Sequence, residues 1–72
     1  MDSRQCKMAR NGLGWKAQEL ADRAGVSYPT LHRFESGQVI ADDSRAKIEE
    51  ALTEAGALFT RRGGRIGTTV PE

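Results

Sequence analysis

Residues 16–37 read KAQELADRAGVSYPTLHRFESG and predict two short helices joined by a tight turn. The first half carries apolar residues at helical spacing, and Gly25 is well placed to end that helix. Ser27 is a good N-cap for a second helix over Tyr28–Ser36, whose first turn tolerates Pro29. The positions expected to face the core are Ala17, Leu20, Ala21, Ala24, Leu31 and Phe34.

The connection between these helices spans residues 25–27. So short a turn makes the two helices cross steeply, at roughly 90 to 120°. Such a crossing needs a small side chain at the contact, a residue free to take positive φ, and an apolar residue that fills the corner. Ala21, Gly25 and Val26 meet these three demands. The stretch therefore predicts a helix-turn-helix unit over residues 16–37.

One further helix is predicted on each side of this unit. Ser3 is expected to cap a helix from about Arg4 to Asn11. On the other side, Asp42 or Asp43 is expected to cap a helix that ends at Gly56. The inward positions are Cys6 and Ala9 in the first of these helices, and Ile48, Ala51, Leu52 and Ala55 in the second.

The last segment reads ALFTRRGGRIGTTVPE over residues 57–72, which is too short and too rich in glycine for another helix. Residues 57–60 and 65–70 are expected to pair as a β-hairpin around a turn at residues 61–64, or to supply a dimerisation strand. The sequence thus predicts an all-α, compact four-helix domain over residues 1–56 with a short C-terminal β-hairpin or strand.

Within residues 16–37, four features match one known family in register: the LA pair, the AGVS segment, the T-L pair and the E-S-G end. By these features the chain resembles the phage-repressor and Cro (XRE-type) helix-turn-helix family. The similarity covers about Met8 to Gly37 well and the fourth helix loosely. It implies a lambda-repressor-like fold in which the third helix reads bases in the major groove of DNA while the second crosses the backbone. The C-terminal hairpin departs from the family, since many relatives add a fifth helix there.

Carried over from this family, the base-reading positions fall on Tyr28, Pro29 and Arg33, with Ser27 and His32 nearby. The Arg33 guanidinium can bond guanine O6 and N7 together, which is worth about 1 to 3 kcal/mol of discrimination. Pro29 offers a base edge van der Waals contact alone, so that readout is expected to be narrower than in the family. For each of these side chains the alternative is a solvated position on an exposed helix face.

Phosphate contacts are expected from Lys16 and Gln18 near the start of the second helix, and from Thr30 and Ser36 in and after the third. The family commonly has Ser followed by Gln where this chain has Lys16 and Ala17, so Ala17 cannot make the family's amide contact. Lys16 can supply a charge directed at phosphate instead, and Gln18 lies one step further along. Each of these residues has a solvated alternative.

The resemblance also assigns structural roles. Arg10 and Glu35 occupy places where similar repressors have a partly buried ion pair linking the first helix to the end of the third. Trp15 lies between two helices, and its bulk favours a half-buried position at the core edge over a stacking platform for a base.

Composition excludes several other classes. The single cysteine, Cys6, cannot form an intramolecular disulfide, and the chain has no cluster of residues for a metal site and no catalytic set. We therefore expect no enzyme activity, no cofactor and no metal. No apolar run approaches a membrane span and MDSRQCKMAR lacks the apolar stretch of a signal peptide, so a cytoplasmic protein without membrane contact is expected.

The charge distribution is uneven although the net charge is +1. Residues 1–37 carry six Lys/Arg against four Asp/Glu, residues 38–56 two against five, and residues 57–72 three against one. This pattern suits an anionic partner at one face of the molecule. The C-terminal segment adds three arginines, Arg61, Arg62 and Arg65. The favoured interpretation is that they are solvated charges of a turn, and the alternative is that they contact the phosphate backbone of DNA.

These observations predict a sequence-specific transcriptional regulator, of the repressor type, that binds double-stranded DNA as a homodimer. One short helix reads few base pairs, so relatives place two copies on half-sites ~34 Å apart. The alternative function is a protein-interaction module, such as an antitoxin or a controller protein, with secondary DNA binding. No domain for a small-molecule effector is evident.

Overall fold

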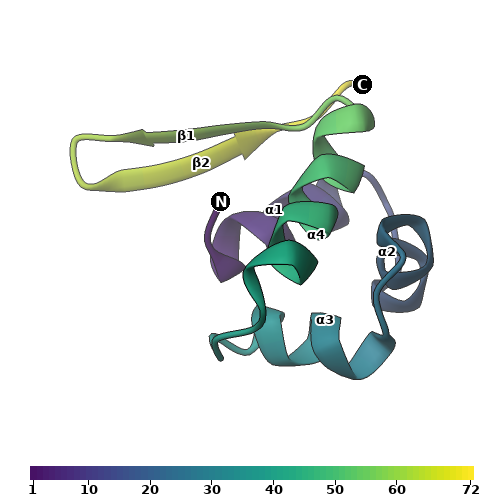
Figure 1. The fold of residues 1–72 in the computed structure, drawn as a ribbon. Coiled ribbons are helices and arrows are strands. Elements are labelled where there is room, and N and C mark those ends of the chain that lie inside the picture. The colour runs from purple at the N-terminus through teal and green to yellow at the C-terminus, as the bar shows by residue number, and fades with distance from the viewer.

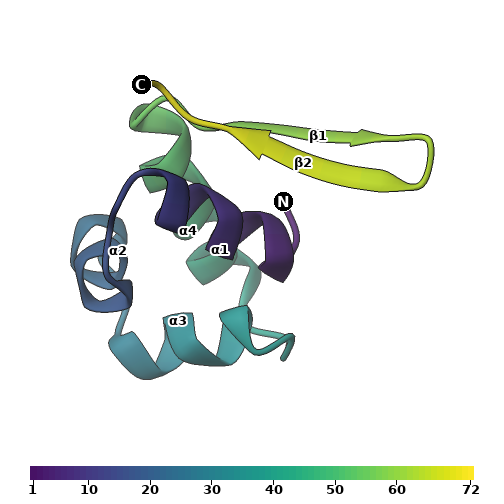
Figure 2. The same cartoon turned by 180° about the vertical axis from the view of Figure 1, so that it is seen from behind.

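A computed structural model describes residues 1–72 as four helices followed by a two-stranded antiparallel hairpin. The elements are α1 (Ser3–Gly12), α2 (Ala17–Ala24), α3 (Tyr28–Glu35), α4 (Asp42–Glu54), β1 (Leu58–Arg62) and β2 (Arg65–Thr69). Figure 1 and the reverse view in Figure 2 show α3 at one end of the molecule and the hairpin at the other. The predicted four-helix domain with a C-terminal hairpin is confirmed, and none of the helices has the length and apolar character needed to cross a membrane.

All four helices contribute to one hydrophobic core. Leu20, Leu31, Ile48 and Leu52 are completely buried, and burying each such side chain contributes about 1.5 to 3 kcal/mol. The positions predicted to face inward are buried or partly buried. The full core consists of Cys6, Ala9, Leu20, Ala21, Ala24, Leu31, Phe34, Ile48, Leu52 and Ala57.

The turn between α2 and α3 has the predicted construction. Gly25 takes a left-handed conformation, with φ of 73° and ψ of 30°. The N–H of Val26 donates to the carbonyl of Ala21 at 3.1 Å, which closes the end of α2. Ser27 caps α3, since its Oγ accepts from the N–H of Thr30 at 3.2 Å. The helix-turn-helix geometry therefore follows from local chemistry at these positions.

Two predicted caps are wrong. The N-cap of α1 is Asp2 and not Ser3, because the Asp2 carboxylate accepts from the N–H of Gln5 while the Gln5 side chain accepts from the N–H of Asp2. The N-cap of α4 is Ala41, which has no side-chain cap. Asp42 and Asp43, the residues predicted to cap α4, lie in its first turn, where their negative charges interact favourably with the positive end of the helix dipole.

The hairpin turn is also shorter than predicted. Gly63 and Gly64 form it alone, with φ of 56° and 74°, the backbone that a two-residue type I′ turn requires. Arg62 pairs directly with Arg65. Arg61 and Arg62 therefore lie in β1 and not in the turn, because two glycines suffice to reverse the chain.

One buried amide fastens the hairpin to the helices. The Nε2 of Gln5 in α1 donates to the carbonyls of Thr60 in β1 and Gly67 in β2, at 2.8 and 3.2 Å. The Oε1 of the same side chain serves the α1 cap. Gln5 thus joins the first turn of the molecule to its last element.

Candidate nucleic-acid interface

The inner face of α3 is fixed by burial. Leu31, Phe34 and Glu35 are its buried residues. Because these three positions face the core, the opposite side of the helix is left in solvent. The predicted base-reading residues on that side are all exposed: Tyr28, Pro29, His32 and Arg33.

The exposed side of α3 is partly ordered by its own side chains. The rings of Tyr28 and His32 stack with centroids 6.1 Å apart and planes 18° apart. The Arg33 Nη2 donates to Thr30 Oγ1 at 3.4 Å, a long bond that leaves the other guanidinium donors free. The helix therefore presents an aromatic pair and an available cation on one surface.

Ser27 and Thr30 meet in the cap of α3. The Ser27 hydroxyl donates to Thr30 Oγ1 at 2.9 Å and accepts from the Thr30 N–H. Its proton is therefore used within the cap, and one lone pair is left for any other contact. Base reading by Ser27 stays a prediction.

The start of α2 holds the two other predicted phosphate contacts. Lys16 is exposed and forms no ion pair, and no side chain caps the first N–H groups of this helix. Gln18 is exposed as well, and its Nε2 donates to Asp22 Oδ1 at 2.9 Å. Lys16 and the uncapped N–H groups can thus receive a phosphate directly, whereas Gln18 must first leave Asp22.

The end of α3 differs from expectation in its hydrogen bonds. The N–H of Ser36 donates to the carbonyls of His32 and Arg33, and its hydroxyl donates to His32 as well. The donors of Ser36 are therefore used inside the chain. By contrast, the N–H groups of Val39 and Ile40 in the following loop donate to no acceptor of the chain, and Val39 is 97% exposed. The sequence did not indicate this loop as a binding element, because residue types alone do not show which backbone N–H groups lack an acceptor.

The expected ion pair between α1 and α3 is present. Arg10 donates from Nε and Nη2 to the two carboxylate oxygens of Glu35, at 2.9 and 3.0 Å, and from Nη1 to the carbonyl of Trp15. The side chains of Arg10 and Glu35 are 15% and 9% exposed. The hydrogen bond to Glu35 raises the pKa of Arg10 above its ordinary value. This pair holds the C-terminal end of α3 against α1.

A third group in this junction went unpredicted. The Cys6 thiol donates to Glu35 Oε2 at 3.4 Å. Burial raises the pKa of this thiol far above its ordinary value, and the nearby Glu35 carboxylate adds to the rise. The sequence placed Cys6 in the core correctly, but its hydrogen bond joins residues far apart in the chain.

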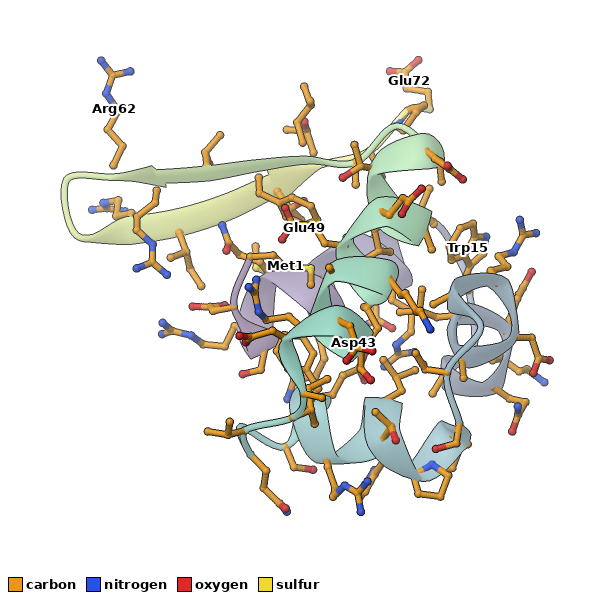
Figure 3. The ribbon with its side chains drawn as sticks, in the orientation of Figure 1. Met1, Trp15, Asp43, Glu49, Arg62 and Glu72 are labelled. Carbon is orange, nitrogen blue, oxygen red and sulfur yellow. The ribbon has the colours of Figure 1, made fainter.

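Trp15 lies at the core edge as expected. It is partly buried against the hydrophobic core, and the guanidinium carbon of Arg23 lies 4.3 Å from its ring centroid. Figure 3 shows Trp15 beside α2 and away from α3. It therefore takes no place on the exposed surface of α3.

The hairpin arginines are remote from α3. The hairpin lies at the opposite end of the molecule in both ribbon views (Figures 1 and 2). DNA lying against α3 would not reach Arg61, Arg62 or Arg65 of the same copy. The interpretation that these residues contact phosphates of that DNA is not supported by their placement.

Comparison with known proteins agrees with this geometry. Residues 7–52 match a protein family described as Helix-turn-helix, and the match covers more than half of the chain. A search of curated proteins found no significant match. The matched residues include the whole of α2 and α3 and most of the two helices that support them.

Proposed function

This chain belongs to the Cro/C1-like helix-turn-helix family of DNA-binding regulators, and we propose that it reads a specific double-stranded sequence with α3 in the major groove. The proposal extends to a repressor that binds a two-fold symmetric operator as a homodimer. No cofactor or small-molecule effector enters it.

The observation that supports this proposal best is the division of α3 into two sides. One side is buried through Leu31, Phe34 and Glu35, which fixes the helix on the core. The other exposes Tyr28 and Arg33, free to meet a ligand. A helix fixed in this way can hold its exposed side chains against base edges without moving.

Within the proposal the side chains divide by role. Arg33 bonds a guanine, Tyr28 packs on a thymine methyl or bonds a phosphate, and Pro29 gives van der Waals contact. Ser27 supports them mainly as the cap, and His32 through its stack on Tyr28. The proposed phosphate contacts are Lys16, Gln18 and Thr30, together with the free N–H groups of Val39 and Ile40. Ser36 joins them only when its hydroxyl leaves the carbonyl of His32.

The length of α3, which has eight residues, supports the homodimer. One such helix spans a few base pairs, so that specificity at the scale of a regulatory site needs two copies on half-sites ~34 Å apart. A two-fold axis between the copies gives a palindromic operator.

The experiment is selection from a random-sequence duplex library at two salt concentrations, with the wild type, Arg33→Ala and Lys16→Ala compared. We expect the wild type to enrich a two-fold symmetric site. Arg33→Ala should relax one base position per half-site, at a cost of about 1 to 3 kcal/mol, whereas Lys16→Ala should weaken all sequences equally and reduce the salt slope by about one per contact.

The opposite result has a definite meaning. Absence of enrichment, with weak binding that disappears in moderate salt, would leave only the sequence-independent phosphate attraction. The fold would then serve a protein partner, as in an antitoxin or controller protein, and specific readout by α3 would be wrong.

A further inference from the structure

The tip of the hairpin carries an unfavourable pair of like charges. Arg62 and Arg65 are directly opposite each other across the two strands, both are exposed, and neither forms an ion pair. Like charges at directly opposed positions destabilise a hairpin. The neighbouring Arg61 differs, since its Nη2 lies 3.5 Å from Asp2 Oδ2. Figure 3 shows Arg62 pointing away from the helices.

The C-terminal half of α4 also carries an unfavourable pair of like charges, which are negative. Glu50 and Glu54 are one helical turn apart, exposed and without an ion pair, whereas Glu49 pairs with Arg45 at 3.7 Å. Like charges at this spacing destabilise a helix, and carboxylates near its C-terminus also oppose the helix dipole. No basic residue lies in the last turn of α4. Lys47 and Arg23 line a second hollow together with this acidic pair, and Arg23 itself pairs with Glu19 at 3.1 Å.

These two surfaces do not meet within one molecule. The hairpin leaves the helical body beside the C-terminal end of α4, and its tip extends away from that end (Figures 1 and 2). Both the arginine pair of the hairpin tip and the glutamate pair of α4 can therefore contact a second molecule. Because one is cationic and the other anionic, the chain carries both halves of a complementary contact.

The surface of α4 has room for such a contact. A shallow hollow of about 350 Å³ lies along its outward side, and small residues lie between the carboxylates. The hollow is lined by Arg45, Ala46, Glu49, Glu50, Thr53 and Glu54.

We propose that the hairpin tip of one copy docks on α4 of a second copy, with Arg62 and Arg65 facing Glu50 and Glu54. Two-fold symmetry repeats the contact, so that the arginine pair and the glutamate pair of each copy both meet opposite charges. The exposed ion pairs set the orientation, and the Arg methylene stems pack in the hollow of α4, where Ala46 offers apolar surface. The contact leaves α3 of each copy uncovered.

This inference names the surface that forms the dimer of the proposed function, and it is tested without DNA. Sedimentation equilibrium compares the wild type with Arg62→Glu/Arg65→Glu and with Glu50→Arg/Glu54→Arg. The first variant has two acidic surfaces and the second two basic ones, so neither should self-associate. Mixed together, they restore both contacts and should form a heterodimer.

We expect each double variant to dimerise at least about tenfold more weakly than the wild type, because like charges then face each other. The mixture should regain the wild-type level, and Lys7→Glu, an exposed reversal on α1, should change nothing. Salt should weaken wild-type association.

Three results would overturn the inference: a wild type that is monomeric at all concentrations, variants that dimerise normally, or a mixture that stays monomeric. Misfolding is checked by circular dichroism of each double variant, since all four substituted side chains are exposed and their replacement should leave the helix content of the wild type unchanged. Specific enrichment in the library selection, lost with Arg33→Ala, would show that α3 reads DNA even if this interface were wrong.

Discussion

The junction of α1 with α3 and the tip of the hairpin use charge in opposite ways. In the junction, Arg10 and Glu35 are opposite in sign, nearly buried and joined by two hydrogen bonds. At the tip, Arg62 and Arg65 are alike in sign, exposed and unpaired. The charges that hold this fold together are therefore paired within the chain, while the unpaired charges of the hairpin tip are exposed, where a partner can contact them.

The largest effect should come from breaking the buried pair. Glu35→Ala leaves the Arg10 guanidinium desolvated without its carboxylate and removes the acceptor of the Cys6 thiol. We expect the free energy of unfolding to fall by about 3 to 5 kcal/mol. Urea unfolding monitored by circular dichroism measures this loss.

An exposed ion pair provides the matched control. Glu19 and Arg23 lie 3.1 Å apart on α2, and their side chains are 43% and 53% exposed. Glu19→Ala should therefore change the free energy of unfolding by less than about 1 kcal/mol. Equal losses in the two variants would remove the distinction between buried and exposed charge.

A smaller effect should separate the hairpin from the helices. Gln5→Ala removes the donor to the carbonyls of Thr60 and Gly67 and leaves two acceptors in a partly buried place. We expect a loss of about 1 to 3 kcal/mol. Hydrogen exchange should show hairpin amides that open more often, with the amides of α2 and α3 changed less.

Gln5→Glu sharpens this test. A carboxylate at this position has no N–H to donate and repels the two carbonyls, so it should loosen the hairpin more than Gln5→Ala does. If Gln5→Glu matched the wild type, the amide would not be what holds the hairpin.

The smallest effect concerns Asp2, the carboxylate nearest to a hairpin arginine. The hydrogen bond from the Gln5 N–H holds its pKa below the ordinary value, against partial desolvation and with help from Arg4. A lowered pKa in the folded state gives stability that is present above the unfolded pKa and is lost as pH falls through the folded one. Acid should therefore weaken the wild type at this position.

The comparison variant is Asp2→Asn, which keeps the cap but does not titrate. At about pH 7 the wild type should be more stable by about 0.3 to 1 kcal/mol, the worth of a carboxylate at a helix N-terminus. In urea unfolding this gap should close as pH falls from the unfolded pKa of Asp2 through its lowered folded pKa. A gap that stayed constant with pH would mean that the charge of Asp2 contributes nothing.

The helices and the turn between α2 and α3 were predictable because their signals are local. Gly25 and Ser27 act on neighbours within a few residues, and apolar spacing alone placed Leu20 and Leu31 in the core. The cap of α1 carries a local signal too, since Asp2 and Gln5 have the spacing of a capping box, although the neighbouring Ser3 is also a residue type that commonly caps helices.

Contacts between residues that are distant in the chain could not be predicted from residue patterns alone. The Arg10–Glu35 pair was expected from the family resemblance, and no pattern in the letters indicated the hydrogen bonds from Cys6 or Gln5. The backbone donors of Val39 and Ile40 were hidden for a related reason, because free N–H groups depend on loop geometry. At α3, the sequence predicted which side chains are exposed, while the bonds among Ser27, Thr30 and Arg33 needed coordinates.

The Gln5 amide also bears on the order in which the molecule folds. Its two acceptors are 55 and 62 positions away along the chain, so the contact closes a loop of almost the whole sequence. Closing so long a loop is entropically costly until other contacts have shortened it. We therefore expect the helices to assemble first and the hairpin to dock after the rate-limiting step. Substitutions at Gln5 should then accelerate unfolding and leave the folding rate nearly unchanged.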